Sequence, residues 1–267
     1  WVECFRKEDP RRLYTTGTGW SLIDEPGPVE GADYLAIGRV GPNRVRGETG
    51  WFGHDYAASI SGVTVPVVSH EIGQWCAYPD YGIIRKFTGY LRPGNYEIFR
   101  DSLASHGLLG MDERYAKASG RFQYLCYKEE IEANLRTPGL AGFQLLDLHD
   151  YIGQGTALVG LLDTFWEPKG YATPDEFREF CNATVPLARL DKRVFTTADT
   201  LDAEVEVAHF GARPLNNTSP GWKVLDASGK TLAEGRWPEQ TIPLGRGLSL
   251  GKVTMNLSSV PAPQACK

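Results

Sequence analysis

The stretch from Val65 to Trp75 constrains the fold of this chain most strongly. It opens with a short, uncharged run rich in β-branched residues, which is typical of a strand buried on both faces of a parallel sheet. The run ends in the acid Glu71, which is flanked by His70 and followed by Gln74. A buried strand of this kind delivers polar side chains to its carboxyl end. We therefore predict that Glu71 is a functional carboxylate at the rim of a parallel sheet.

The composition of the chain argues against two classes of binding partner, nucleic acids and anionic membranes. The chain has 267 residues and a formal net charge of -5, and no block of Lys and Arg stands out. We therefore expect no nucleic-acid partner and no attraction to an anionic membrane. No apolar run is long enough to cross a bilayer. The five cysteines form no CxxC pair, so the sequence gives no local support for zinc, and disulfide pairing and oligomeric state stay open.

Helical and strand patterns alternate over the first 190 residues, which favours an α/β fold. The chain opens with an amphipathic segment rather than a signal peptide, so we expect it to begin inside a helix of a longer parent protein. Thr173 caps a helix whose first residue is Pro174. The predicted helices cover residues 1–8, 96–106, 112–135 and 174–181, with a short one opening at 50–56. The predicted strands cover residues 11–16, 33–37, 65–69 and 140–146.

The pattern changes near Leu190. Residues 201–207 alternate strictly between apolar and polar, and residues 222–235 are typical of a hairpin around an Asp-Ala-Ser-Gly turn. We predict a domain boundary here, with an α/β domain over 1–190 and an antiparallel β domain over 191–267. The second domain offers four or five strands, fewer than the roughly seven of an immunoglobulin-like sandwich.

Polar residues also follow the predicted strand 140–146, where Asp147, His149 and Asp150 lie within four positions. Such a cluster could hold a metal ion, but no further ligand set is evident. We favour hydrogen bonding to a ligand or capping of the loop, and predict no metal and no cofactor. For Glu71 itself the alternative is an acid that caps the turn after its strand.

Three segments occur in an order known from one enzyme family. Residues 9–14 (Asp-Pro-Arg-Arg-Leu-Tyr) resemble the segment before the fifth barrel strand of glycoside hydrolase family 2. Residues 66–71 (Pro-Val-Val-Ser-His-Glu) resemble its seventh strand with the nucleophilic glutamate, and residues 142–150 resemble the eighth. A β-sandwich then follows. The resemblance implies strands five to eight of a (β/α)8 TIM barrel, followed by a partial antiparallel β-sandwich.

The family contains β-galactosidases, β-glucuronidases and β-mannosidases, so the resemblance implies a retaining glycoside hydrolase acting on β-linked sugars, with Glu71 as the nucleophile. Retention requires a second carboxyl group about 5–5.5 Å away as acid/base. In the family this residue belongs to an Asn-Glu pair on the fourth strand, and no such pair occurs here. We therefore expect the acid/base residue to precede Trp1, and the chain alone to have little or no hydrolase activity.

The resemblance also implies a carbohydrate site at the strand ends. The eighth strand departs from the usual Phe-x-Trp-Asp, because residues 143–147 are Phe-Gln-Leu-Leu-Asp. An aromatic wall for the sugar must then come from elsewhere, and Trp20, Trp75 and Trp166 are candidates, although tryptophans more often belong to a core. The residues predicted to bind substrate are His70, Gln74, Trp75, Trp20, Asp147, His149 and Asp150.

Two other functions stay open. The first is a non-catalytic carbohydrate-binding protein that uses the same aromatic rim. The second is an inactive structural fragment whose unpaired barrel edges associate with another chain. The sequence leaves the sugar, its linkage and the cellular location undetermined, and polysaccharide-degrading relatives favour a periplasmic or secreted parent protein.

Overall fold

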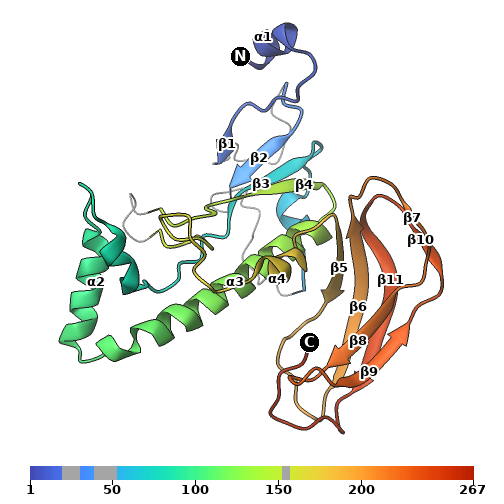
Figure 1. Cartoon of the computed structure of the whole chain (residues 1–267). Coiled ribbons are helices and arrows are strands. Elements are labelled where there is room, and N and C mark those ends of the chain that lie inside the picture. Colours follow the sequence, from blue (N-terminus) through green and yellow to red (C-terminus); the bar gives the residue numbers. More distant parts are fainter. Residues whose placement is uncertain (20–30, 39–52, 152–156) are drawn as a thin grey trace.

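The computed structural model describes residues 1–19, 31–38, 53–151 and 157–267. Helices and a parallel sheet form one side of the molecule, and antiparallel strands from the C-terminal part form the other (Figure 1). The long helix α3 extends from the first side to the second. The mixed α/β character of the first part and the antiparallel character of the second agree with the sequence prediction.

In the described part of the chain, the parallel sheet contains four strands in chain order. These are β1 (Thr18–Gly19), β2 (Leu35–Gly38), β3 (Val67–Ile72) and β4 (Leu140–Leu145). Each strand pairs in parallel with the next one along the chain, so all four carboxyl ends lie at one edge. Apolar side chains of β2, β3 and β4 pack in one core cluster with residues 56–60. That these strands belong to a closed barrel stays a prediction.

The predicted strand over residues 11–16 is wrong. These residues form turns and extended chain, and Tyr14 instead exchanges bonds with Asp33. The Tyr14 N–H donates to the Asp33 carboxylate at 2.8 Å, and the Asp33 N–H donates to the Tyr14 carbonyl at 2.8 Å. The Asp33 carboxylate therefore accepts the hydrogen bond that the Tyr14 N–H would otherwise donate to the backbone of a neighbouring strand. The predicted strands at 33–37 and 140–146 are confirmed by β2 and β4. The strand predicted at 65–69 is confirmed with shifted ends, because β3 begins at Val67 and continues through Glu71 to Ile72.

The predicted helices over 1–8, 96–106, 112–135 and 174–181 are confirmed with small changes at their ends. Of the short helix expected to open at 50–56, residues 50–52 lie outside the described residues, residues 53–56 are not helical, and a 3-10 helix begins at Ala57. The capping box at Thr173 is present, although its helix ends three residues earlier than predicted. No helix among the described residues has both the length and the apolar character needed to span a membrane. The helices are α1 (Val2–Glu8), η1 (Ala57–Ile60), η2 (Tyr81–Lys86), α2 (Gly94–Ser105), η3 (Leu109–Met111), α3 (Asp112–Arg136) and α4 (Pro174–Arg178).

The C-terminal strands form three antiparallel sheets, with the orders β11-β6-β5, β8-β9 and β10-β7. The predicted hairpin is confirmed by β8 and β9, whose turn is closed by Asp226. Six strands follow residue 190, more than predicted, because β7 and β10 are short and lack alternation. The strands are β5 (Thr184–Arg189), β6 (Thr200–His209), β7 (Leu215–Thr218), β8 (Gly221–Leu225), β9 (Thr231–Arg236), β10 (Gln240–Ile242) and β11 (Gly245–Asn256).

The strand β5 bears on the predicted domain division. It precedes residue 190, yet it pairs with β6 along its whole length. The antiparallel sheet therefore begins before the predicted boundary. The division into separate domains over 1–190 and 191–267 stays a prediction.

The C-terminal end of α3 joins the two sides of the molecule. Leu135 packs against apolar clusters of both, and Arg136 is fully buried with its guanidinium 2.7 Å from the Glu132 carboxylate. Arg246 of β11 donates to the carbonyl oxygens of Asn134 and Thr137, both at 3.1 Å. A cation at the C-terminus of a helix stabilises carbonyl groups that lack partners within the helix.

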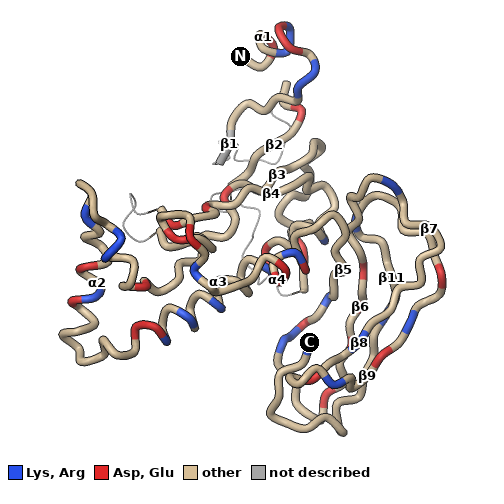
Figure 2. Tube along the Cα trace, viewed as in Figure 1, with Lys and Arg blue, Asp and Glu red and all other residues tan. Residues whose placement is uncertain are grey.

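Charged residues of both signs are interspersed along the described chain (Figure 2). Most of their ion pairs lie at the surface, where each contributes little to stability. The exceptions are the buried pairs along α3, such as Glu132 with Arg136, and the buried pair of Asp150 with Lys169.

Replacement of Arg246 by methionine should lower the free energy of unfolding by about 1–2 kcal/mol, because two helix-end carbonyls lose a charged donor. The exposed Arg236 of β9 offers a matched control, and Arg236→Met should change stability by less than about 0.5 kcal/mol. Urea unfolding of both variants measures the difference. Equal losses would contradict a role for Arg246 in joining the two sides.

Candidate active site

A β-bulge lies at the carboxyl end of β3. His70 and Glu71 lie opposite the single residue Gln144 of β4, because the pairing register shifts between Ser69 and Ile72. A bulge of this kind redirects side chains and is frequent next to active sites. The predicted carboxylate therefore lies at an irregular strand end.

The backbone at Glu71 is in the left-handed region, with φ of 59°. This conformation costs a residue with a side chain about 1–2 kcal/mol, and such strain concentrates at functional sites. Two residues later Gly73 has φ of 84°, and a Cβ there would overlap the ring of Tyr127. The chain therefore turns tightly at Gly73, directly after β3 ends at Ile72.

Both oxygens of the Glu71 carboxylate have a polar neighbour. The Gln74 amide donates to Oε2 at 2.8 Å, and His70 Nε2 lies 3.3 Å from Oε1. The other ring nitrogen of His70 lies 2.6 Å from Gln144 Oε1. The Glu71 side chain nevertheless keeps 43% of its surface exposed. The structure therefore brings Glu71, His70 and Gln74 together around an accessible carboxylate.

Trp75 is hydrogen-bonded to side chains of α3. Its indole N–H donates to Glu130 Oε2 at 2.8 Å, and its carbonyl oxygen accepts from the Gln123 amide. The polar edge of the ring therefore faces the helix. Trp20, the other tryptophan predicted at the site, lies outside the described residues.

Asp147 and His149 follow β4 and lie near each other. The Leu146 N–H donates to the Ile72 carbonyl at 2.9 Å, so the segment after β4 begins beside the end of β3. His149 Nδ1 lies 3.5 Å from Asp147 Oδ2. The His149 ring stacks on Trp166 with centroids 4.4 Å apart, and 60% of Trp166 is exposed.

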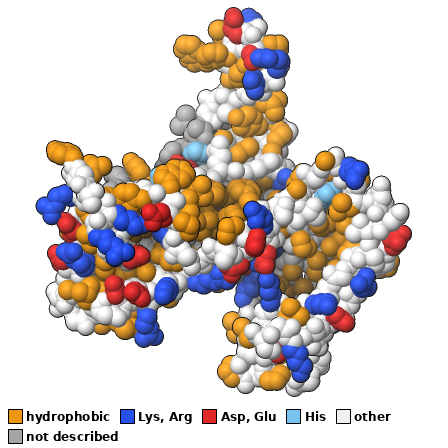
Figure 3. All heavy atoms as spheres, in the orientation of Figure 1, with side chains coloured by type: hydrophobic (Ala, Val, Ile, Leu, Met, Phe, Trp, Pro, Cys, Tyr) orange, Lys and Arg blue, Asp and Glu red, His pale blue; other side chains and the backbone are white. Residues whose placement is uncertain are grey.

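Exposed apolar side chains occur in the segment after β4 as well as elsewhere in the described chain. Among its described residues, four large ones are at least 40% exposed: Leu148, Tyr151, Phe165 and Trp166. Figure 3 shows hydrophobic side chains gathered across the middle of the face it presents. A ring stacked on an imidazole and open to solvent on its other face provides a flat surface for an apolar ligand face.

Asp150 lies in a separate polar cluster. It is buried, and its Oδ1 accepts from the Lys169 ammonium at 2.7 Å and from the Gly160 N–H at 3.0 Å. Burial raises the pKa of Asp150 and lowers the pKa of Lys169, although each charge favours the other. The structure therefore engages Asp150 in an internal ion pair, away from the contacts of Glu71.

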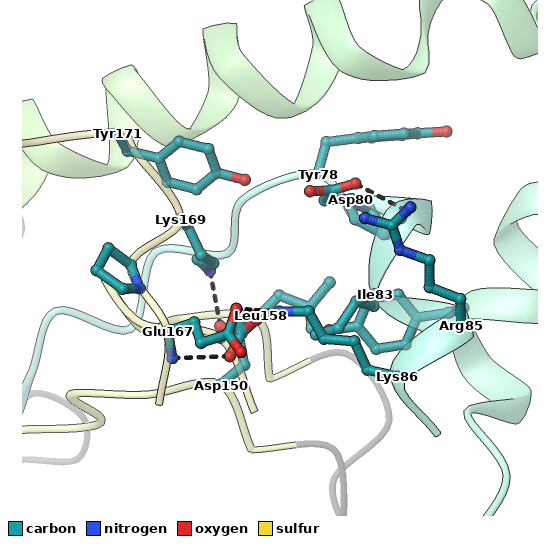
Figure 4. A pocket seen from close by; sticks show the side chains of 15 residues that line it. Tyr78, Asp80, Ile83, Arg85, Lys86, Asp150, Leu158, Glu167, Lys169 and Tyr171 are labelled. Atoms are coloured by element: carbon teal, nitrogen blue, oxygen red, sulfur yellow. Dashed lines mark hydrogen bonds and ion pairs between the residues drawn. The ribbon is translucent and has the colours of Figure 1, made fainter. Parts of the chain in front are cut away.

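A cavity of about 250 Å³ lies beside this ion pair, between the segments that follow β3 and β4 (Figure 4). Lys86 of η2 reaches across it to Asp163 at 2.6 Å and to Glu167 at 2.7 Å. Burial would raise the pKa of Asp163, but the bonds from Lys86 and from two backbone N–H groups lower it overall. The charged groups that line the cavity therefore largely satisfy one another. Among the described residues, no group of three or more His, Cys, Asp or Glu side chains is arranged to hold a metal ion.

Four residues of the region carried no predicted role: Gln144, Tyr127, Glu130 and Lys169. Gln144 is a polar residue inside an apolar strand, which is a usable signal. Glu130 follows Tyr127 by three positions and so lies on the same face of α3. Lys169 carries no local signal, because its partner Asp150 is distant in sequence.

Comparisons with known proteins give one family match, which is confined to the C-terminal part of the chain, and one structural similarity. Residues 199–267 match a family model described as "Domain of unknown function (DUF8488)". No curated protein matches. Among solved structures, the chain is similar to a β-D-mannosidase from Dictyoglomus thermophilum, with 14% sequence identity and a TM-score of 0.45. The similarity covers 84% of this chain and 27% of that chain.

Lys169→Met should lower the free energy of unfolding by about 3–5 kcal/mol at neutral pH, because the buried Asp150 carboxylate loses its counter-ion. The double variant Lys169→Met/Asp150→Leu should recover most of the loss. The cost of Lys169→Met should also shrink as the pH falls, because burial raises the pKa of Asp150 and the neutral acid needs no counter-ion. Urea unfolding at several pH values tests this.

Lys252→Met provides the control, because Lys252 pairs with Asp202 at 2.8 Å on the surface. It should cost less than about 1 kcal/mol. A double variant no more stable than Lys169→Met would show that the pair is not the source of the loss.

Proposed function

We propose that this chain carries the nucleophile of a retaining β-glycoside hydrolase. In this proposal β1 to β4 correspond to strands five to eight of a TIM barrel, and a β-sandwich follows. The observation that carries the proposal is the setting of Glu71. Its carboxylate is accessible at the end of a parallel strand, and its backbone is strained and lies in a β-bulge. An acid that served only to end a strand would not require this conformation.

The chemistry asks little of Glu71 beyond position. Its carboxylate attacks the anomeric carbon, and the bond to the leaving oxygen breaks as a second carboxylic acid protonates that oxygen. Water then attacks the glycosyl ester, and the second residue, now a carboxylate, takes the proton. The Gln74 N–H fixes one oxygen of Glu71 at 2.8 Å, which orients the plane of the attacking group.

The neighbouring residues supply the sugar contacts. Asp147 and His149 offer hydrogen bonds to hydroxyl groups, and the exposed face of Trp166 offers a surface for the C–H face of a pyranose ring. The proposed substrate is a β-linked carbohydrate, either a β-galactoside or a sugar hydrolysed by related enzymes of the same clan. Because Asp150 is engaged with Lys169, it acts on the fold of this region more than on the sugar.

One observation also supports a non-catalytic carbohydrate-binding protein. Trp166 is exposed and stacked on His149, so it provides a platform that needs no nucleophile. This alternative requires sugar affinity that survives Glu71→Gln and falls on Trp166→Ala.

Fluorinated β-glycosides with a dinitrophenyl leaving group test the nucleophile directly. The leaving group departs without protonation, so labelling requires Glu71 but no second acid, and the fluorine next to the anomeric carbon slows hydrolysis of the ester. We expect one glycosyl label per chain, located on Glu71 by peptide mass mapping, from at least one reagent in a set based on glucose, galactose, mannose and glucuronic acid.

Two variants complete this experiment. Glu71→Gln should remove the label, whereas Glu234→Gln, on the exposed face of β9, should leave it unchanged. Sugar binding measured by calorimetry without any label on Glu71 would favour the non-catalytic alternative.

A further inference from the structure

Three polar side chains of α3 lie on one face of the helix. Gln123, Tyr127 and Glu130 are spaced by four and three positions, so they follow one another along that face. All three are buried. Buried polar groups in a helix are costly unless each has a partner, so this face must serve polar groups of neighbouring segments.

The first segment served is the turn after Glu71. Glu130 Oε2 accepts from the Gly73 N–H and from the Trp75 indole N–H, both at 2.8 Å. The Gln123 amide donates to the Trp75 carbonyl. Glu130 and Gln123, at the two ends of this helical face, therefore both bind the residues that follow the candidate nucleophile.

The second segment follows β4. The Tyr127 hydroxyl lies 2.8 Å from the Val159 carbonyl oxygen and 3.1 Å from the Asp147 carbonyl oxygen. The Gln123 amide also lies 3.0 Å from the Leu158 carbonyl oxygen. The same face of α3 therefore holds the backbone on both sides of the candidate site.

Tyr127 connects the two segments by itself. Its ring lies against Gly73, so closely that a Cβ on this glycine would overlap it, while its hydroxyl reaches Asp147. We propose that Tyr127 and Glu130 are positioning residues, which set Glu71 and the segment beginning at Asp147 relative to each other. The inference rests on the proposed function, because it concerns the same nucleophile.

The expected effect follows from the sensitivity of catalysis to distance. Tyr127→Phe removes the hydroxyl and keeps the ring, so the Gly73 contact remains while the link to Asp147 is lost. A displacement of about 1 Å at the reacting group reduces rate by about 100-fold. Such a change lowers the rate of reaction at saturation more than it lowers reagent affinity.

Labelling kinetics with the fluorinated β-glycosides provide the test. In Tyr127→Phe, the rate of label formation at saturation should fall about 10- to 100-fold, with the half-saturating concentration changed less than about twofold. Tyr124→Phe is the matched control on the same helix, because the Tyr124 hydroxyl contacts the Glu176 carbonyl at 3.3 Å instead. It should label at the wild-type rate.

Glu130 adds a graded series. Glu130→Gln keeps an oxygen that can accept from Gly73 and Trp75, whereas Glu130→Met keeps none. We expect the labelling rate to fall in the order wild type, Glu130→Gln, Glu130→Met. Should Glu130→Met fail to fold, Tyr127→Phe and Glu130→Gln still decide the matter.

The outcomes separate the two proposals. A wild-type rate in Tyr127→Phe and in Glu130→Gln would overturn the positioning role and leave Glu71 as the nucleophile. A slowing in Tyr124→Phe equal to that in Tyr127→Phe would show a general packing effect and also overturn it. No label on Glu71 in the wild-type protein would overturn the proposed function, and the positioning role with it.

Discussion

Burial of charge along α3 is the constraint on which the rest of this structure depends. The second half of the helix is enclosed from several directions, yet it is rich in glutamate, and an isolated buried carboxylate is strongly unfavourable. Glu129 forms an ion pair with Arg193, and Glu132 forms one with Arg136. Glu130 accepts a hydrogen bond from the Gly73 N–H in the turn after β3. Two of these three glutamates therefore have their partners in segments outside the helix, which ties the burial of α3 to the segments that follow β3 and β5.

Much of the fold follows from local patterns. The apolar run before His70 predicts β3, the spacing over residues 112–135 predicts α3, and strict alternation predicts β6. Periodicity is a property of neighbouring residues, so it can be recognised without tertiary information. The strand expected at 11–16 failed for the opposite reason, because the bond that decides it comes from Asp33, far along the chain.

The candidate site divides in the same way. Glu71, His70 and Gln74 lie within five positions, and the end of β3 brings them together. The bulge could not be predicted, because it is defined by how β3 pairs with β4. The position of Asp150 could not be predicted either, because burial beside Lys169 turns a residue of a promising local motif into half of an ion pair. Sequence patterns locate polar residues, but their partners depend on distant segments.

The pairing of β5 with β6 has a consequence for how this protein is divided into modules. The matched family model begins at residue 199, whereas the sheet it enters begins at Thr184. Exchange of the matched segment alone between genes would leave β6 with a bare edge, and such edges recruit strands from other chains. A segment that keeps β5 paired with β6 must therefore begin at or upstream of residue 184.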